Sequence, residues 1–114
     1  MEIRLEDQDG RTVCERCVLA DGPLTRMRGL LGRRVLPSGE GLLLRPAGSI
    51  HTLFMRFPID AVFLDGERRV VKVVAGLRPW RAAAGRGARA VLELPAGEAG
   101  RLGMRAGDQL RWEA

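Results

Sequence analysis

The feature that most constrains the fold is a series of short apolar segments separated by turn residues. Asp60 to Leu64 and Arg69 to Val74 are two such segments, and the Asp65-Gly66 dipeptide between them strongly indicates a β-hairpin. Similar runs cover Thr12 to Ala20, Gly41 to Leu44, Ile50 to Phe57, Ala88 to Leu94 and Gln109 to Trp112. About seven short strands at this spacing are typical of a small barrel or sandwich.

Two segments predict helix. Asp21 can cap a helix, Pro23 suits its first turn, and Leu24, Met27, Leu30 and Leu31 would share one face. Pro95 to Leu102 predicts one or two further helical turns. The sequence therefore predicts a mainly β fold (α+β by count): a small half-closed antiparallel β-barrel with one short helix and one or two helical turns.

The length of 114 residues indicates a single domain, residues 1–114, with a substantial core. The opening residues MEIRLEDQDG lack the basic and apolar regions of a secretory signal, and no apolar run approaches the ~20 residues needed to span a bilayer. From these features we expect a cytoplasmic location.

The chain carries a net charge of +5, most of it dispersed. The exception is the segment 66–90, where seven basic residues face one acidic residue, a local charge of +6. A candidate basic surface there comprises Arg78, Arg81, Arg86 and Arg89. This segment favours RNA or an acidic partner as one alternative, although Trp80 is its only aromatic residue and single-strand binders usually offer several.

Cys14 and Cys17 form a lone CxxC motif within a predicted strand. Residues three apart on a regular strand point to opposite faces, so we expect no metal site, and without a secretory signal we expect no disulfide. Gly85 to Ala90 matches GxGxxA, but it precedes a strand instead of following one, which excludes a dinucleotide fingerprint. No cofactor is predicted.

The stretch Ser49 to Asp60 holds the only histidine in the chain among many apolar residues. Burying Arg56 without a partner would cost several kcal/mol, and Asp60 is the nearest carboxylate. One interpretation is a structural clamp in which Arg56 and Asp60 pair around Pro58. Another is a pocket with His51, Arg56, Asp60 and Glu93 as the polar groups that bind a small anionic or sugar-like ligand.

A catalytic role is the third alternative. His51 or Asp60 could act as the general base of a hydrolase. The serines and threonines show no nucleophile elbow, and a single histidine often serves only to bond a backbone carbonyl. No catalytic residue is therefore assigned, and we expect a non-catalytic ligand-binding or interaction module.

An ordered set of motifs resembles one family. It comprises Arg28-Gly29-Leu30-Leu31, Leu36-Pro37, Gly41 to Leu44, Phe54-Met55-Arg56-Phe57-Pro58-Ile59-Asp60, Phe63-Leu64-Asp65, Val70-Val71, Val91 to Gly97 and Gly103 to Asp108. Over about Cys17 to Leu110, the chain resembles the bacterial and archaeal domain of unknown function 192, also called uncharacterised protein family 0127.

This resemblance implies a compact, mainly β domain with no agreed enzyme activity. Many relatives carry an export signal or lipid anchor, and some are associated with secretion or pilus assembly, which suggests a link to cell-envelope or secretion processes. The chain departs from the common pattern because Met55-Arg56-Phe57 runs straight into Pro58, where many members have a longer Met-Lys-Asn-Thr segment.

Overall fold

The computed structural model describes residues 1–20 and 35–113. These residues form eight strands and one helix, α2, at Glu98–Leu102. The strands are β1 (Glu2–Glu6), β2 (Thr12–Ala20), β3 (Glu40–Leu44), β4 (Ser49–His51), β5 (Ile59–Leu64), β6 (Val70–Leu77), β7 (Ala82–Ala84) and β8 (Ala90–Pro95). The mainly β prediction is confirmed. The helix predicted around Leu24 to Leu31 lies outside the described residues.

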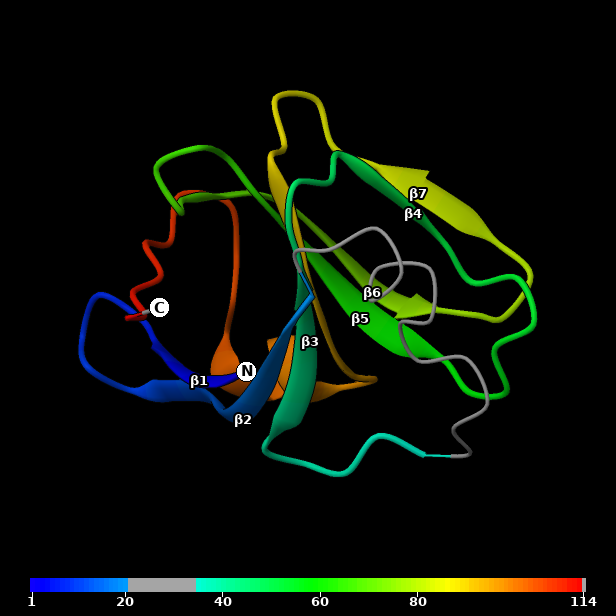
Figure 1. The fold of residues 1–114 in the computed structure, drawn as a ribbon, viewed down its shortest axis with the longest axis horizontal. Helices are drawn as coiled ribbons and strands as arrows, with labels where there is room; N and C mark the ends of the chain where they lie inside the picture. The colour runs from blue at the N-terminus through cyan, green and yellow to red at the C-terminus, as the bar shows by residue number, and fades with distance from the viewer. Residues whose placement is uncertain (21–34, 114) are drawn as a thin grey trace.

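Six strands form one curved sheet in the order β1-β2-β3-β8-β5-β6, and β4 pairs with β7 in a separate two-stranded ribbon (Figure 1). The sheet is mixed, because β2 and β3 run parallel while the other neighbours are antiparallel. It is not closed into a barrel, since β1 and β6 do not pair. The expected half-closed antiparallel barrel is therefore corrected to an open mixed sheet.

The C-terminal segment links the two edges of the sheet in place of a predicted last strand. Arg111 forms a single bridge with Glu6 at the end of β1, and Gln109 forms one with Arg69 before β6. Leu110 lies between them, fully buried, and its N–H donates to the Arg68 carbonyl at 3.0 Å. Two isolated bridges satisfy the backbone here without a continuous ladder.

The core lies on both faces of the sheet, because all six residues of β5 are buried. Successive side chains of a strand point to opposite faces, so Val62 and Leu64 lie on one face, where they pack in a cluster with Leu102 of α2. Ala61 and Phe63 point to the other face, in a cluster that includes Ile50 of β4. Such strands read as continuous apolar runs because neither side meets water.

The predicted hairpin joins β5 to β6. The carboxylate of Asp65 accepts hydrogen bonds from the N–H groups of Glu67 and Arg69 at 2.8 and 3.0 Å, which fixes the turn. Arg68 adopts a positive φ of 66° within it. An aspartate that bonds the backbone beyond itself is the usual chemistry of such turns.

Three other predictions differ from the structure. The strand expected over Ile50 to Phe57 ends at His51, because Leu53 and Phe54 turn the chain away. A short strand, β7, lies within the loop expected over Leu77 to Gly87. Strand β1 was not predicted, although Ile3 and Leu5 alternate with charged residues in the manner of an edge strand.

The prediction that the two thiols face opposite ways is wrong. Cys14 pairs with Leu5 and Cys17 with Ile3, so three steps along β2 match two steps along β1, and a β-bulge separates the cysteines. Both are buried in the same core cluster. Their shared hydrogen bond lowers the pKa of Cys14 and, together with burial, raises that of Cys17. Within the described ranges, no third metal-binding side chain joins them.

Candidate functional site

Asp60 is a fully buried residue whose carboxylate is held by backbone groups. Oδ1 accepts from the Gly76 N–H at 2.9 Å, and Oδ2 accepts from the N–H groups of Gly97 and Ala99 at 3.0 and 2.9 Å. These bonds join β5 to the end of β6 and to the start of α2. The carboxylate therefore serves the fold, and Arg56 is not its partner.

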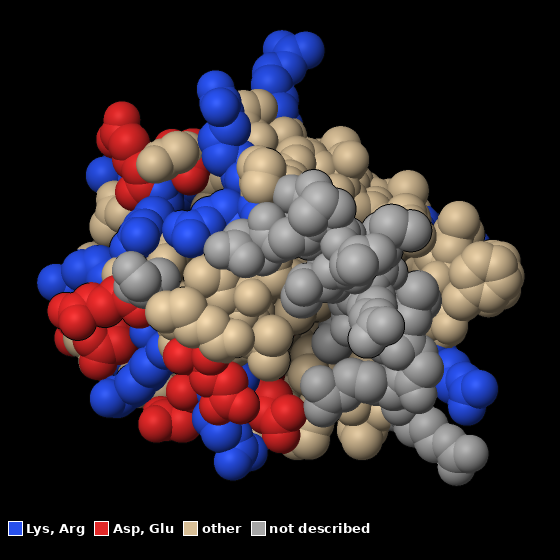
Figure 2. Space-filling model, in the orientation of Figure 1, with Lys and Arg blue, Asp and Glu red and all other residues tan. Residues whose placement is uncertain are grey.

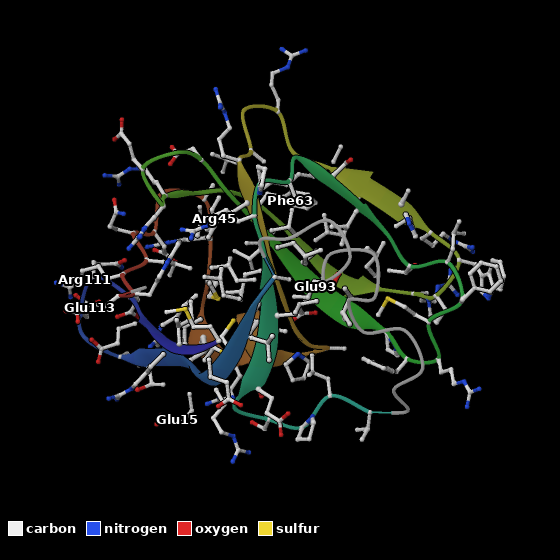
Figure 3. The ribbon with its side chains drawn as sticks, viewed as in Figure 1. Glu15, Arg45, Phe63, Glu93, Arg111 and Glu113 are labelled. Atoms are coloured by element: carbon white, nitrogen blue, oxygen red, sulfur yellow. The ribbon has the colours of Figure 1, made fainter. Side chains whose placement is uncertain are left out.

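Glu93 is buried on β8, opposite Leu42 and Ala61 of the neighbouring strands. Its neighbours Leu92 and Leu94 belong to the α2 face, so strand alternation places the Glu93 side chain on the other face from Asp60. Burial raises the pKa of Glu93 to about 7. Figure 3 shows it near the middle of the molecule, away from the labelled arginines.

Arg56 and His51 are exposed, and so is Pro58. Within the described part of the chain, Arg56 makes no ion pair with Asp60. The predicted clamp is therefore not formed, because backbone N–H groups already satisfy the carboxylate. The predicted four-residue pocket is not assembled either, since its two carboxylates lie on opposite faces of the sheet and its two bases are exposed.

Thr52 joins the loop after β4 to the loop before β7. Its hydroxyl donates to the carbonyl of Arg78 at 2.7 Å and accepts from the Arg81 N–H at 2.8 Å. Its backbone N–H donates to the Arg81 carbonyl, and its carbonyl accepts from the Trp80 N–H. Thr52 has no exposed surface, so it anchors the two loops against each other.

These loops form what we call the loop tip, residues 52–57 and 78–81. Phe54 and Trp80 contact each other edge to face there, with ring centroids 4.7 Å apart. Both have positive φ values, 66° and 65°, which are strained for residues other than glycine. Phe54 is 67% exposed, Trp80 54% and the adjacent Leu53 39%.

The loop tip carries three exposed arginines, Arg56, Arg78 and Arg81. No acidic residue occurs between 49 and 59 or between 77 and 84, so the tip is locally basic. Arg86 and Arg89 lie beyond the other end of β7, in its connection to β8. The predicted basic surface is therefore divided, and on the face in Figure 2 Lys and Arg are spread over several regions.

A shallow hollow of about 450 Å³ adjoins the tip along β4 and β7. Ser49, Ile50 and His51 line it together with Ala82, Ala83 and Ala84. The small alanine side chains leave room above the ribbon. His51 pairs with Ala82 at the end of the ribbon nearest the tip, so the hollow and the aromatic pair are continuous along the chain.

Two predicted site residues, His51 and Arg56, thus come together with Arg78 and Arg81 of the predicted basic surface. Sequence reasoning missed Thr52, Leu53 and Phe54 as tip residues because a run of apolar residues predicts a buried strand. The arginine and tryptophan in the loop 77–87 were visible, but nothing local showed that Phe54 lies against Trp80.

The fold and the tip define a small, mainly β domain with an exposed aromatic and basic loop tip. The sequence model of the family DUF192, described as an uncharacterized ACR, matches residues 4–112, and the chain belongs to this family. The match begins earlier than the predicted Cys17 because it includes most of β1.

Two curated archaeal relatives are UPF0127 proteins. That of Thermococcus sibiricus is 34% identical over 91% of this chain and 70% of its own length. That of Pyrococcus furiosus is 37% identical over 82% of this chain and 83% of its own. These relatives are from archaea, so they do not support a specifically bacterial assignment.

Two bacterial crystal structures share the fold. A protein of unknown function from Novosphingobium aromaticivorans is 29% identical, with a TM-score of 0.81 over 98% of this chain and 84% of that one. A candidate transcription regulator from Sinorhizobium meliloti is 27% identical, with a TM-score of 0.84 over 97% and 92%. In the residues described here, no helix is long and apolar enough to cross a membrane.

Proposed function

We propose that this protein is a non-catalytic interaction module whose loop tip docks on an acidic, partly apolar segment of another protein. The observation that carries the proposal is the exposed pair of Phe54 and Trp80, whose rings contact each other edge to face. Leaving two aromatic rings in water forgoes the stabilisation that burial would give. Tryptophan and arginine are also the residues that most often dominate binding energy at protein interfaces.

The charge of the tip specifies the chemistry of the partner. Arg56, Arg78 and Arg81 are exposed on the same two loops as the aromatic pair, and neither loop contains a carboxylate in its sequence. Carboxylates of a partner can therefore pair with guanidinium groups that would otherwise face only solvent. The hollow beside the tip can receive an apolar side chain from the same segment.

Nucleic acid fits this geometry less well than protein does. The planes of Phe54 and Trp80 are inclined by 60°, so the two rings do not offer parallel platforms for successive bases. Single-strand binders rely on stacking along such platforms in a basic groove. The candidate regulator from Sinorhizobium meliloti keeps this alternative worth a direct test.

Fluorescence anisotropy with a labelled peptide that alternates glutamate and leucine tests the proposal. We expect saturable binding that weakens about tenfold in Trp80→Ala, a loss of ~1.4 kcal/mol. Arg105→Gln removes one exposed arginine outside the tip and is the matched control, with affinity unchanged. Raising the salt concentration weakens the wild-type complex because the tip pairs are exposed.

Two further probes decide between classes of partner. A labelled oligouridine and vesicles containing phosphatidylserine are titrated under the same conditions. Binding of either probe in preference to the peptide, with the same loss in Trp80→Ala, would assign the tip to RNA or to a membrane surface and overturn the protein partner. Equal peptide binding by wild type and Trp80→Ala would show that the loop tip is not the binding surface.

A further inference from the structure

An open cleft of about 700 Å³ lies away from the loop tip, where the end of β1, the β5–β6 turn and the C-terminal segment meet. Its lining residues are Arg4, Glu6, Arg68, Arg111, Trp112 and Glu113. Arg111 and Glu113 appear together at the left of Figure 3, on the side where the chain ends. The proposed function does not involve this cleft.

Arg68 is the central residue of the cleft. Its guanidinium lies over the Trp112 ring, 3.8 Å from the centroid, and Nη1 donates to the Trp112 carbonyl at 2.5 Å. The remaining donors of this fork make no hydrogen bond to another described residue. Arg68 also has a positive φ of 66°, a conformation that is unfavourable for a residue other than glycine. The turn thus holds a charged group in place at some cost.

The charge of Arg68 is not neutralised within the described residues. It has no carboxylate partner there, and it lies close enough to Arg45 for the two positive charges to interact. Burial lowers the pKa of Arg68, and the charge of Arg45 adds to that effect. Two like charges without an intervening anion create a favourable position for one.

Trp112 supplies a second, independent observation. Its side chain is buried, and its indole N–H is the one buried side-chain donor without an acceptor in the described ranges. A buried donor without an acceptor destabilises the fold, because it has lost its hydrogen bond to water without replacing it. Arg68 and Trp112, which both line the cleft, therefore stack against each other, and the buried indole N–H has no partner.

The two carboxylates that line the cleft leave this positive charge in place. Glu6 lies 3.7 Å from Arg4, so these charges offset each other. Glu113 is exposed next to the chain end. Nη2 of Arg111 donates hydrogen bonds to the carbonyls of Asp7 and Gln8, which fixes the direction of the side chain. A guanidinium has five N–H donors, so further donors remain.

We propose that Arg68, with Arg111 and Trp112 beside it in the cleft, forms a binding site for a small, doubly charged oxyanion such as a phosphate group. A planar guanidinium fork fixed by stacking suits the two-pronged recognition of phosphate or carboxylate oxygens. The site is an addition to the partner-binding tip and is independent of it.

Trp112 reports on this site directly. In a Trp80→Phe background it is the sole tryptophan, so its fluorescence follows the cleft. Inorganic phosphate and malonate are titrated separately against sodium chloride of matched ionic strength. We expect a saturable change with an oxyanion; preference for phosphate or for malonate identifies whether phosphoryl or carboxyl groups are the natural class.

Variants distinguish a specific oxyanion site from the general attraction of anions to a basic protein. Arg68→Gln should weaken oxyanion binding about tenfold, the value of one charge-assisted hydrogen bond. Arg68→Lys should also weaken it, because an ammonium cannot reproduce the fork. Arg86→Gln, which removes an exposed arginine from the β7–β8 connection, should leave binding unchanged. Thermal unfolding confirms that each variant folds.

The proposal is overturned if neither phosphate nor malonate changes the Trp112 fluorescence more than chloride does. It is also overturned if Arg86→Gln loses as much oxyanion affinity as Arg68→Gln. Peptide binding by the loop tip is measured on Arg68→Gln and wild-type protein that both retain Trp80. Arg68→Gln should leave peptide binding intact. An error in the proposed oxyanion site and an error in the proposed function of the tip therefore give different results.

Discussion

The surroundings of Asp60 and the loop tip use charged groups in opposite ways. The Asp60 carboxylate is buried and satisfied by three backbone N–H groups from β6 and from the start of α2. Arg56, Arg78 and Arg81 are exposed on the two loops that carry the aromatic pair. One region uses its charge to join elements of the fold, and the other leaves its charges available to a partner.

This contrast shows why closeness in sequence misled the prediction of a site. Arg56 and Asp60 are four residues apart, but the chain turns at Phe54 and enters β5 at Ile59, which separates an exposed loop from a buried strand. The charge pair that looked like one unit therefore belongs to two regions with different roles. Substitutions in each region can test the division.

The largest effect is expected at Asp60. Asp60→Ala removes a fully buried carboxylate that accepts three backbone hydrogen bonds, so the free energy of unfolding should fall by roughly 3–5 kcal/mol. Asp60→Asn keeps the shape of the side chain, but its amide N–H₂ group would face backbone N–H donors. This variant should therefore also lower the free energy of unfolding. Urea unfolding measures both. Arg56→Ala is the control, and a comparable loss there would restore the clamp interpretation.

Glu93 should produce the next largest effect, and it depends on pH. Its pKa is raised from an ordinary value of 4.5 to about 7, so the folded protein keeps a proton that the unfolded chain has lost. Stability from this group is therefore full below pH 4.5 and decreases as pH rises toward 7, by about 3 kcal/mol in all.

Glu93→Gln removes that titration. The difference in unfolding free energy between pH 5 and pH 8 should shrink in the variant relative to the wild type. Burial raises the pKa of Asp7, but the hydrogen bonds from Arg11 and Asp9 lower it more strongly, so the net pKa is lowered. Asp7 therefore titrates below pH 4 and does not affect the comparison between pH 5 and pH 8. Identical pH profiles would show that Glu93 titrates as an ordinary carboxyl.

Thr52 should give a smaller loss that sharpens the comparison. Thr52→Val keeps the shape and removes the hydroxyl, which leaves the Arg78 carbonyl and the Arg81 N–H without their partner. We expect a loss of about 1–3 kcal/mol in unfolding free energy and weaker peptide binding, because the tip is no longer fixed. Thr12→Val, at an exposed hydrogen bond to Arg4, is the control. Unchanged peptide affinity in Thr52→Val would show that rigidity of the tip is unimportant.

Much of the fold followed from local signals. Apolar runs located β2, β3, β5, β6 and β8, and Asp65-Gly66 located the hairpin, because turn chemistry and burial act on neighbouring residues. The bulge in β2, the early end of β4 and the parallel pairing of β2 with β3 depend on distant partners. Thr52, for example, bonds residues 26 and 29 positions away, and no local pattern reveals that contact.

The candidate site was harder to predict than the fold. The sequence identified His51, Arg56, Arg78 and Arg81 as noteworthy, and these residues do lie in or beside the loop tip. It could not show that Phe54 is exposed, because an aromatic residue among other apolar residues normally indicates burial. Nor could it show that Asp60 is fully occupied by backbone groups, since backbone partners leave no mark in the sequence.

The most direct test combines affinity and stability in one variant, Arg78→Gln/Arg81→Gln. The account predicts that affinity for the glutamate–leucine peptide falls about tenfold and loses much of its salt dependence. It also predicts that the unfolding free energy stays within about 0.5 kcal/mol of the wild type, as for other exposed sites. Loss of stability with unchanged peptide affinity would contradict it, because the tip arginines would then serve the fold.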